Sequence, residues 1–251
     1  MTDSPTTRVS VELVPRSRSG LRAEIAQVVA ALPGVDTVNI PDLTRYSLRS
    51  WLGCAFARPQ YRAVPHLRAV DFDPREPLPF LPALDEHGIT EVLVVTGDAP
   101  ADMSAKVYDQ DAVDLIRRLR RDAPHLTVYA GLDPYRQSFA RERDYLERKL
   151  DAGAAGFFTQ PFFDLRVMDA YSDLIPDGTQ VWWGATSILT EPSLNYWRAR
   201  NHAVFPRTFT PTLECNRAFA ADLLAFARER GQNAYFMPVK VDVQEYLAGI
   251  L

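Results

Sequence analysis

The chain has 251 residues, 47% of them hydrophobic, so it can bury a large core as one α/β barrel or as two smaller domains. Its net charge of −4, from 28 basic and 32 acidic residues, argues against a nucleic-acid-binding surface. We expect no leader peptide and no membrane span, because no apolar run is long enough. Cys54 and Cys215 lack metal-binding spacing, which favours a metal-free, cytoplasmic protein.

Short β-rich runs alternate with longer helical patterns along the chain. The predicted strands cover residues 8–14, 36–40, 64–72, 90–97, 126–132, 155–160, 179–186 and 233–239. The predicted helices cover residues 20–32, 44–57, 79–87, 110–122, 139–152, 165–174, 192–202 and 213–230. Several strands, such as VLVV and VWW, are apolar on both faces, as a covered parallel sheet requires.

This alternation predicts the fold class. Eight βα units in about 250 residues are typical of a closed (β/α)8 TIM barrel, here one α/β domain over residues 1–251. A doubly wound open sheet also alternates, but it would need a Gly-rich phosphate turn after an early strand, and the sequence has no GxGxxG. No Gly/Ser linker divides the chain.

Polar residues follow most of the predicted strands. In a TIM barrel the chemistry lies at these carboxyl ends of the strands. Each residue alone is more often a loop or helix-capping residue, but together they indicate a site. The ring comprises Glu12, Asn39, Asp42, Asp71, Asp73, Thr96, Asp98, Asp133, Thr159, Gln160, Thr186, Ser187 and Lys240.

Glu12 is the most informative member of this ring. In SVELVPR it alternates with Val11 and Leu13, so its side chain points to the barrel interior or mouth. A buried carboxyl group resists ionisation and suits a general acid, whereas an interior ion pair is the structural alternative. Asp98 and Gln160 end two other apolar strands and offer hydrogen bonds to a heterocycle, or to a helix or turn.

Four segments resemble the methylenetetrahydrofolate reductase family. SVELVPR resembles the family's S-F-E-F-F-P-P, which places Glu12 on its catalytic glutamate, and VPHLRAVDFD resembles P-H-L-T-C-I-D, which places His66 on its histidine. ITEVLVVTGDAP resembles I-L-A-L-R-G-D-P-P, with Asp98 on the active-site aspartate and Thr96 in place of the arginine. LERKLDAGAAGFFTQPFFD resembles L-K-R-K-V-D-A-G-A-N-R-A-I-T-Q-F-F-F-D, which places Gln160 on the folate-contacting glutamine.

The resemblance is good from about residue 8 to residue 165 and weaker beyond, where NAYFMPVK resembles H-F-Y-T-L-N-R. It implies a TIM barrel that reduces 5,10-methylenetetrahydrofolate to 5-methyltetrahydrofolate with NAD(P)H through bound FAD. Glu12 would protonate the folate, and Asp98 would tune the charge near pterin and flavin. The implied substrate contacts are Gln160, Phe162 and Lys240, and the implied cofactor contacts are Asn39, His66, Thr96, Glu142, Arg148 and Lys149.

The departures from the family leave alternatives open. VNIPDLTRYSLRS replaces the family's Gly-rich flavin turn V-T-Y-G-A-G-G-S, and Pro41 stiffens this corner. Some family members pass hydride directly from NADH without flavin, so that route stands beside the FAD route. A folate-dependent C1 or methyl transferase and a non-catalytic folate- or nucleotide-binding paralogue are the other functions. The choice of NADH or NADPH and a homo-oligomeric state also stay open.

Overall fold

The computed structural model describes residues 7–99 and 106–251. Its strands are β1 (Val9–Glu12), β2 (Thr37–Ile40), β3 (Arg62–Arg68), β4 (Glu91–Val95), β5 (Thr127–Leu132), β6 (Gly156–Pro161), β7 (Gln180–Thr186) and β8 (Asn233–Met237). They form a closed parallel barrel in which each strand pairs with the next and β8 pairs with β1. The predicted (β/α)8 barrel is therefore confirmed.

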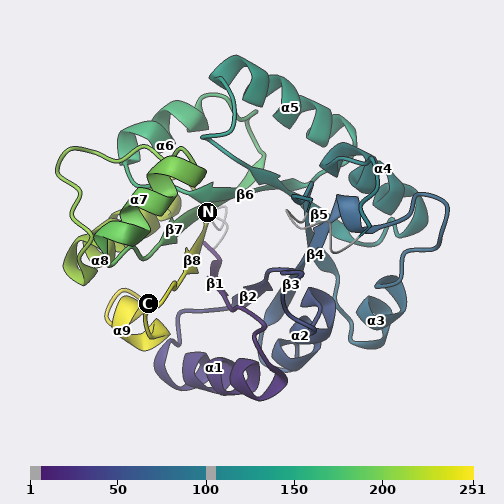
Figure 1. Ribbon diagram of the computed structural model, residues 1–251, viewed down its shortest axis with the longest axis horizontal. Helices are drawn as coiled ribbons and strands as arrows, with labels where there is room; N and C mark the ends of the chain where they lie inside the picture. The colour runs from purple at the N-terminus through teal and green to yellow at the C-terminus, as the bar shows by residue number, and fades with distance from the viewer. Residues whose placement is uncertain (1–6, 100–105) are drawn as a thin grey trace, which may run out of the picture.

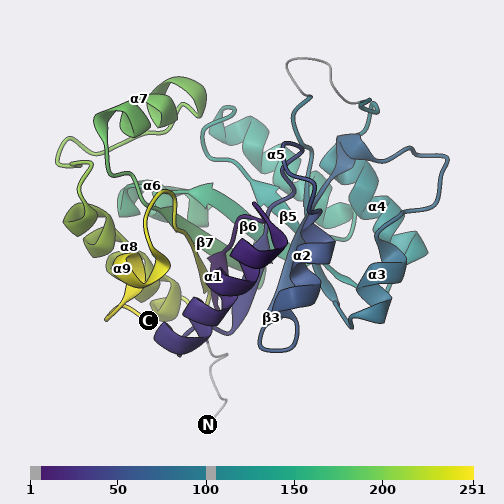
Figure 2. The same cartoon turned by 60° about the horizontal axis from the view of Figure 1, so that its bottom comes forward.

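The helices surround the ring of strands (Figure 1). They are α1 (Arg18–Ala31), α2 (Ser50–Ala57), α3 (Leu81–Glu86), α4 (Ala112–Asp122), α5 (Phe139–Asp151), α6 (Leu165–Ser172), α7 (Glu191–Arg200), α8 (Leu213–Glu229) and α9 (Val243–Leu247). In Figure 2, α7 lies at the top of the molecule, above α6 and α8. None of the helices in the described ranges is long and apolar enough to cross a membrane.

Three elements differ from the sequence prediction. β3 ends at Arg68 and a 3-10 turn, η1 (Ala69–Asp71), follows it. α2 begins at Ser50 rather than at residue 44, because Arg49 stays extended and reaches two aspartates. The helix α9 was not predicted, although Asp242 caps its first backbone N–H groups in the usual way.

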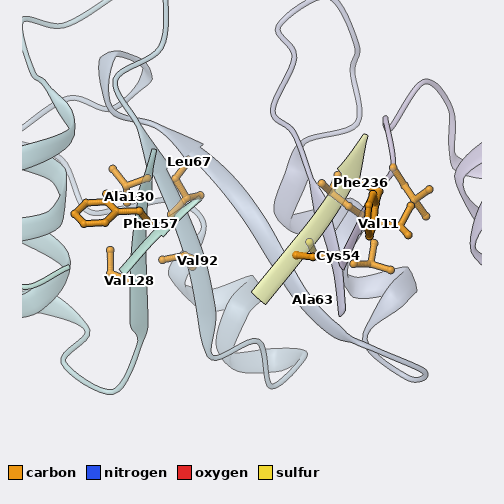
Figure 3. Close-up of a cluster of buried hydrophobic side chains, with 14 of the residues drawn as sticks. Val11, Cys54, Ala63, Leu67, Val92, Val128, Ala130, Phe157 and Phe236 are labelled. Atoms are coloured by element: carbon orange, nitrogen blue, oxygen red, sulfur yellow. The ribbon is translucent and has the colours of Figure 1, made fainter. Parts of the chain in front are cut away.

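The barrel has an inner and an outer apolar layer, because side chains alternate along each strand. The inner layer contains Val64, Leu93, Tyr129, Phe158, Trp182 and Tyr235. The outer layer fills the space between strands and helices, and Figure 3 shows part of it, including Val11 of β1 and its pairing partner Phe236 of β8. This alternation turns Glu12 inward, since Val11 belongs to the outer layer.

An ion pair closes the amino-terminal end of the barrel. Arg8 donates from Nη1 and Nη2 to the two carboxylate oxygens of Glu91, at 2.7 and 2.8 Å. Its Nη2 also donates to Thr37 Oγ1 at 3.0 Å, and the guanidinium lies 4.8 Å from the ring centre of Trp182. The chemistry therefore has to use the opposite end, where the strands finish.

We expect Arg8→Met to lower the free energy of unfolding by about 2–3 kcal/mol, because it removes both hydrogen bonds to the poorly solvated carboxylate of Glu91 and leaves it only the exposed Arg62, 3.9 Å away. Urea unfolding curves of the two single variants and of Arg8→Met/Glu91→Leu measure the effect. The double variant should recover most of the loss, since an apolar pair of similar volume replaces a partly buried ion pair. A double variant as unstable as the sum of the singles would contradict this assignment.

Candidate active site

A cavity of about 740 Å³ opens at the carboxyl ends of the strands, a volume typical of a small-molecule site. Residues at or beyond the ends of β1, β2, β3, β4, β5, β6 and β8 line it, and α5 forms one wall. Glu12, Asp98 and Gln160 all line this one cavity. The three segments that suggested the site in the sequence therefore meet in space.

Glu12 lies at the inner end of the cavity in a small polar cluster. Asn39 Nδ2 donates to Glu12 Oε2 at 3.0 Å and lies 3.1 Å from His66 Nε2. Burial raises the pKa of Glu12 to about 7, although the hydrogen bond from Asn39 opposes the shift. Burial lowers the pKa of His66 to about 3, so its imidazole is neutral at physiological pH.

The ion-pair alternative for Glu12 finds no cation in the described part of the chain. The one basic side chain within 4.0 Å is the neutral His66, whose Nε2 lies 3.8 Å from Glu12 Oε2. Burial of this carboxyl group, with no cation beside it, raises its pKa to about 7 and so favours the protonated form far more than for an exposed glutamate. Glu12 can therefore donate a proton to a molecule in the cavity.

Asp98 and Gln160 lie on the open side of the cavity. The Asp98 side chain is 86% exposed and accepts a hydrogen bond from Arg136 Nη2 at 3.2 Å. Gln160 is exposed at the end of β6, while Thr159 before it is buried. Both side chains can therefore contact a ligand without rearrangement of the barrel.

Two predicted substrate contacts lie elsewhere. Phe162 is fully buried in the outer layer, with its ring centre 5.6 Å from Trp183 and 5.7 Å from Tyr171, so the structure corrects its expected stacking role. Lys240 is exposed in a left-handed backbone conformation, with φ 56°, and is not among the described residues that line the cavity. Its expected substrate contact stays a prediction.

The wall formed by α5 carries the predicted cofactor contacts Glu142 and Lys149. Glu142 accepts a hydrogen bond from Gln137 Nε2 at 2.7 Å. Lys149 Nζ donates to the Gly131 carbonyl at 2.6 Å and lies 3.9 Å from the ring centre of Tyr145, and burial lowers its pKa to about 8. These polar groups thus find partners within the chain.

The other two predicted cofactor contacts also have internal partners. Thr96 Oγ1 lies 3.3 Å from Tyr145 Oη and accepts a hydrogen bond from the backbone N–H of Ala112. Arg148 is largely exposed and lies 3.6 Å from a carboxylate oxygen of Asp111. The ring of Tyr145 therefore sits between Thr96 and Lys149 and occupies the middle of this wall.

The corner after β2 presents a proline and a buried carboxylate to the cavity. Arg49 Nη2 lies 2.7 Å from Asp42 Oδ2 and 3.2 Å from Asp71 Oδ2, and its guanidinium stacks over Trp51. Burial raises the pKa of Asp42 to about 6, with Arg49 opposing the shift. Pro41 and Asp42 therefore form a rigid acidic corner held by one arginine.

Comparison with known proteins identifies the family. The family model for methylenetetrahydrofolate reductase matches residues 55–189, more than half of the chain. The chain belongs to the methylenetetrahydrofolate reductase family. The 5,10-methylenetetrahydrofolate reductases of Escherichia coli and Shigella flexneri are 30% identical to it over 104 residues. That match covers 41% of this chain and 35% of each relative, so it spans about a third of their length.

Solved structures share the barrel at low sequence identity. A Clostridium thermocellum protein that binds two copies of 5-methyl-5,6,7,8-tetrahydrofolic acid has a TM-score of 0.67 and 13% identity, covering 98% of this chain and 94% of its own. A 2,3-dimethylmalate lyase has a TM-score of 0.57 and 11% identity, covering 99% of this chain and 76% of its own. At sequence identities this low, the similarity shows a shared fold and nothing about function.

The residues after β2 do not fit the diphosphate of FAD, the flavin expected of a methylenetetrahydrofolate reductase. A dinucleotide's phosphates are bound by backbone N–H groups of a Gly-rich turn or a helix N-terminus, or by cations. Here Pro41 has no N–H, and the carboxylate of Asp42 would repel a phosphate. On the α5 wall, Glu142 and Lys149 already bind neighbouring groups, and three of the arginines that line the cavity, Arg136, Arg141 and Arg148, lie away from the β2 corner where the family has its Gly-rich flavin turn. We therefore derive no step through a flavin.

Two residues of this reductase-family site were missed in the sequence. Tyr235 lines the cavity, donates its hydroxyl to the Thr159 carbonyl and is fully buried, which raises its pKa. The alternation in NAYFM already places it on the inner face. Tyr145 follows Glu142 by three residues and precedes Lys149 by four, so helical spacing places all three on one face.

No cluster of three or more metal-binding side chains occurs in residues 7–99 and 106–251.

Proposed function

We propose that this chain reduces 5,10-methylenetetrahydrofolate to 5-methyltetrahydrofolate with NAD(P)H, and that Glu12 supplies the proton. The observation that carries the proposal is a buried, unpaired Glu12 with a pKa near 7 at the inner end of a 740 Å³ cavity. Membership of the methylenetetrahydrofolate reductase family supports the substrate and the reaction type.

The reaction needs one proton and one hydride. Glu12 gives its proton to the folate nitrogen whose bond to the bridging carbon breaks, so the five-membered ring opens to an iminium ion. NAD(P)H supplies the hydride, which adds to this carbon and yields the methyl group. The carboxylate of Glu12 then takes up a proton from water. Its pKa near 7 suits both halves of this cycle at neutral pH.

The cavity supplies orientation. Leu93, Phe158 and Met237 form an apolar floor, against which a flat heterocycle packs. Gln160 offers a donor and an acceptor to the edge of the pterin, and Asp98 accepts from a ring N–H. Arg136 and Arg141 also line the cavity, and their positive charge suits the carboxylates of the folate tail.

An absorbance spectrum followed by an NADH assay tests the proposal. We expect a colourless protein that oxidises NADH or NADPH only when 5,10-methylenetetrahydrofolate is present. A yellow protein that releases flavin on denaturation would instead support the FAD route that the sequence resemblance implies. Folate binding without oxidation of either nicotinamide cofactor would contradict the reductase proposal.

A folate-binding or methyl-transfer function is the second candidate. It is favoured by the Clostridium thermocellum protein, which has a similar barrel over almost its whole length and binds 5-methyl-5,6,7,8-tetrahydrofolic acid. Such a function needs the folate contacts of the cavity but no nicotinamide cofactor. Isothermal titration with 5-methyltetrahydrofolate, compared with the NADH assay on the same preparation, separates the two functions.

We expect Gln160→Ala to weaken folate binding about tenfold, the cost of one or two neutral hydrogen bonds. Lys240→Ala is the matched control: the residue is exposed and does not line the cavity, so folate affinity should stay within about twofold of the parent value. Titration of both variants with a tetrahydrofolate measures this. A larger loss for Lys240→Ala would restore the role that the sequence resemblance implied.

A further inference from the structure

We propose that Ser10 and Asn39 form a positioning relay, which directs the acidic proton of Glu12 to its cavity-facing oxygen, Oε1, and holds His66 as the Nδ1–H tautomer. The part of this proposal that concerns the acidic proton of Glu12 rests on the proposed function. The tautomer of His66 does not, so the two can be tested separately.

The first step of the relay fixes the orientation of the Asn39 amide. Ser10 and Asn39 are both fully buried, and Ser10 Oγ lies 2.7 Å from Asn39 Oδ1. As placed, the amide oxygen accepts and the serine hydroxyl donates; a hydroxyl can also accept, so this contact alone is compatible with either orientation of the amide. Ser10 precedes Glu12 by two residues on β1 and shares its inward face. What favours the orientation seen here is Glu12: its carboxylate only accepts when ionised, so the amide nitrogen, not the amide oxygen, faces Glu12 and His66.

The second step fixes the proton on His66. The Asn39 amide nitrogen carries two hydrogens and accepts none, so both of its neighbours must be acceptors. One neighbour is Glu12 Oε2 at 3.0 Å, and the other is His66 Nε2 at 3.1 Å. A neutral imidazole that accepts at Nε2 carries its hydrogen on Nδ1. His66 therefore cannot donate to Glu12.

The third step places the acidic proton. Glu12 Oε2 accepts the hydrogen bond from Asn39. The other carboxyl oxygen, Oε1, makes no hydrogen bond to the described residues, and Glu12 lines the cavity. A protonated Glu12 therefore presents its O–H from Oε1. Besides His66 on β3, the titratable groups on this side are Tyr235 on β8 and Asp42 beyond β2. Tyr235 donates to the Thr159 carbonyl and Asp42 is paired with Arg49, so neither supplies a donor to Glu12.

The reversed amide is the competing arrangement. It would turn Asn39 Oδ1 toward Glu12 and His66, so both would have to donate to the same oxygen. His66 would then be the Nε2–H tautomer, and the acidic proton would point at Asn39 instead of the cavity. The two arrangements therefore differ in one observable, the nitrogen of His66 that carries hydrogen.

Nitrogen-15 NMR of histidine-labelled protein measures this observable. The chain has 4 histidines, and comparison with His66→Gln assigns the signal of interest. We expect His66 to be neutral with hydrogen on Nδ1 from about pH 5 to pH 8. Asn39→Asp replaces the donor with an acceptor of the same shape, so His66 should change to the Nε2–H or the doubly protonated form. An Nε2–H tautomer in the parent protein would overturn the relay.

Ser10→Ala tests the lock on the amide. We expect partial conversion of His66 to the Nε2–H form, together with a fall in kcat of about tenfold at unchanged KM, a fraction of what general acid catalysis supplies. Melting curves of Ser10→Ala and Asn39→Asp confirm that both variants fold. Unchanged tautomer and kcat in Ser10→Ala would remove Ser10 from the relay. A parent protein without reductase activity but with the Nδ1–H tautomer would contradict the proposed function and leave the relay standing.

Discussion

Glu12→Gln should lose on the order of a hundredfold or more in the reduction of 5,10-methylenetetrahydrofolate while the barrel stays folded, because general acid catalysis is typically worth about 10²–10⁴-fold. The glutamine side chain keeps the size of Glu12 and can still accept the hydrogen bond from Asn39, but it cannot deliver a proton. Folate affinity should therefore stay close to that of the parent protein. Steady-state turnover and folate titration on one preparation measure both quantities.

The pH dependence of the parent protein follows from the raised pKa of Glu12. The protonated acid is the active form, so turnover should fall as the pH rises through about 7. The same proton contributes stability, which is fully present below the ordinary pKa of 4.5 and is lost as the pH rises through about 7. In Glu12→Gln this loss is absent, because glutamine does not ionise.

At pH 8 the variant should therefore be more stable than the parent, by up to about 3 kcal/mol, because the ionised form of the buried Glu12 is disfavoured in the folded state. An interior ion pair would give the opposite sign, since glutamine would then break a favourable contact. Melting temperatures at about pH 5 and pH 8 distinguish the two. Full turnover in a well-folded Glu12→Gln protein would end the proposed mechanism.

Gly184→Ala should lower the free energy of unfolding by about 3 kcal/mol, near the upper end of the usual cost of overpacking. A Cβ atom at this position of β7 would lie 2.4 Å from Tyr235 Cε1 and 2.7 Å from its hydroxyl oxygen. The Tyr235 ring cannot move freely, because it packs 5.5 Å from the ring centre of Phe158 and donates its hydroxyl to Thr159. Displacing it also reshapes the cavity.

A matched control and a double variant test the cause. Gly131→Ala adds the same methyl group to β5, where the nearest side-chain atom is 3.3 Å away, and should cost less than about 1 kcal/mol. Gly184→Ala/Tyr235→Ala should be more stable than the sum of the single losses, because the alanine at 235 removes the clash. Additive losses in urea unfolding would mean that the methyl group at 184 acts through another contact.

The barrel could be predicted from the sequence because its apolar residues recur at strand and helix periods. Two-residue alternation placed Glu12 opposite Val11, and the structure has Val11 in the outer layer and Glu12 on the inner face. The boundaries that were wrong depend on contacts between distant residues. Arg49 remains extended because Asp42 and Asp71 bind it, and helix propensity carries no information about such partners.

The sequence placed a side chain in the cavity where its position at a strand end determines which way it points. It misplaced a side chain where packing against a helix determines this. Asp98 and Gln160 reach the cavity because each lies at or just beyond the carboxyl end of its strand. Phe162 is only two residues beyond Gln160, yet the space under α6 takes its ring into the outer layer. Asn39 was assigned to a cofactor, whereas the structure shows it bonded to Glu12 and Ser10, a partnership between strands that no local pattern reveals.

The seam between β1 and β8 gives the chain an order of assembly during synthesis. Arg8 and Asn233, whose hydrogen bond closes this seam, are 225 positions apart. A ribosome makes β1 before β8, so most of the barrel emerges while Ser10 still lacks its partner Tyr235. The apolar edges of β1 and β7 stay unpaired for that time, and joining such distant segments is slow. A nascent chain stalled before residue 233 would therefore expose two strand edges that chaperones recognise, and these edges would be protected only once β8 is made and pairs with both.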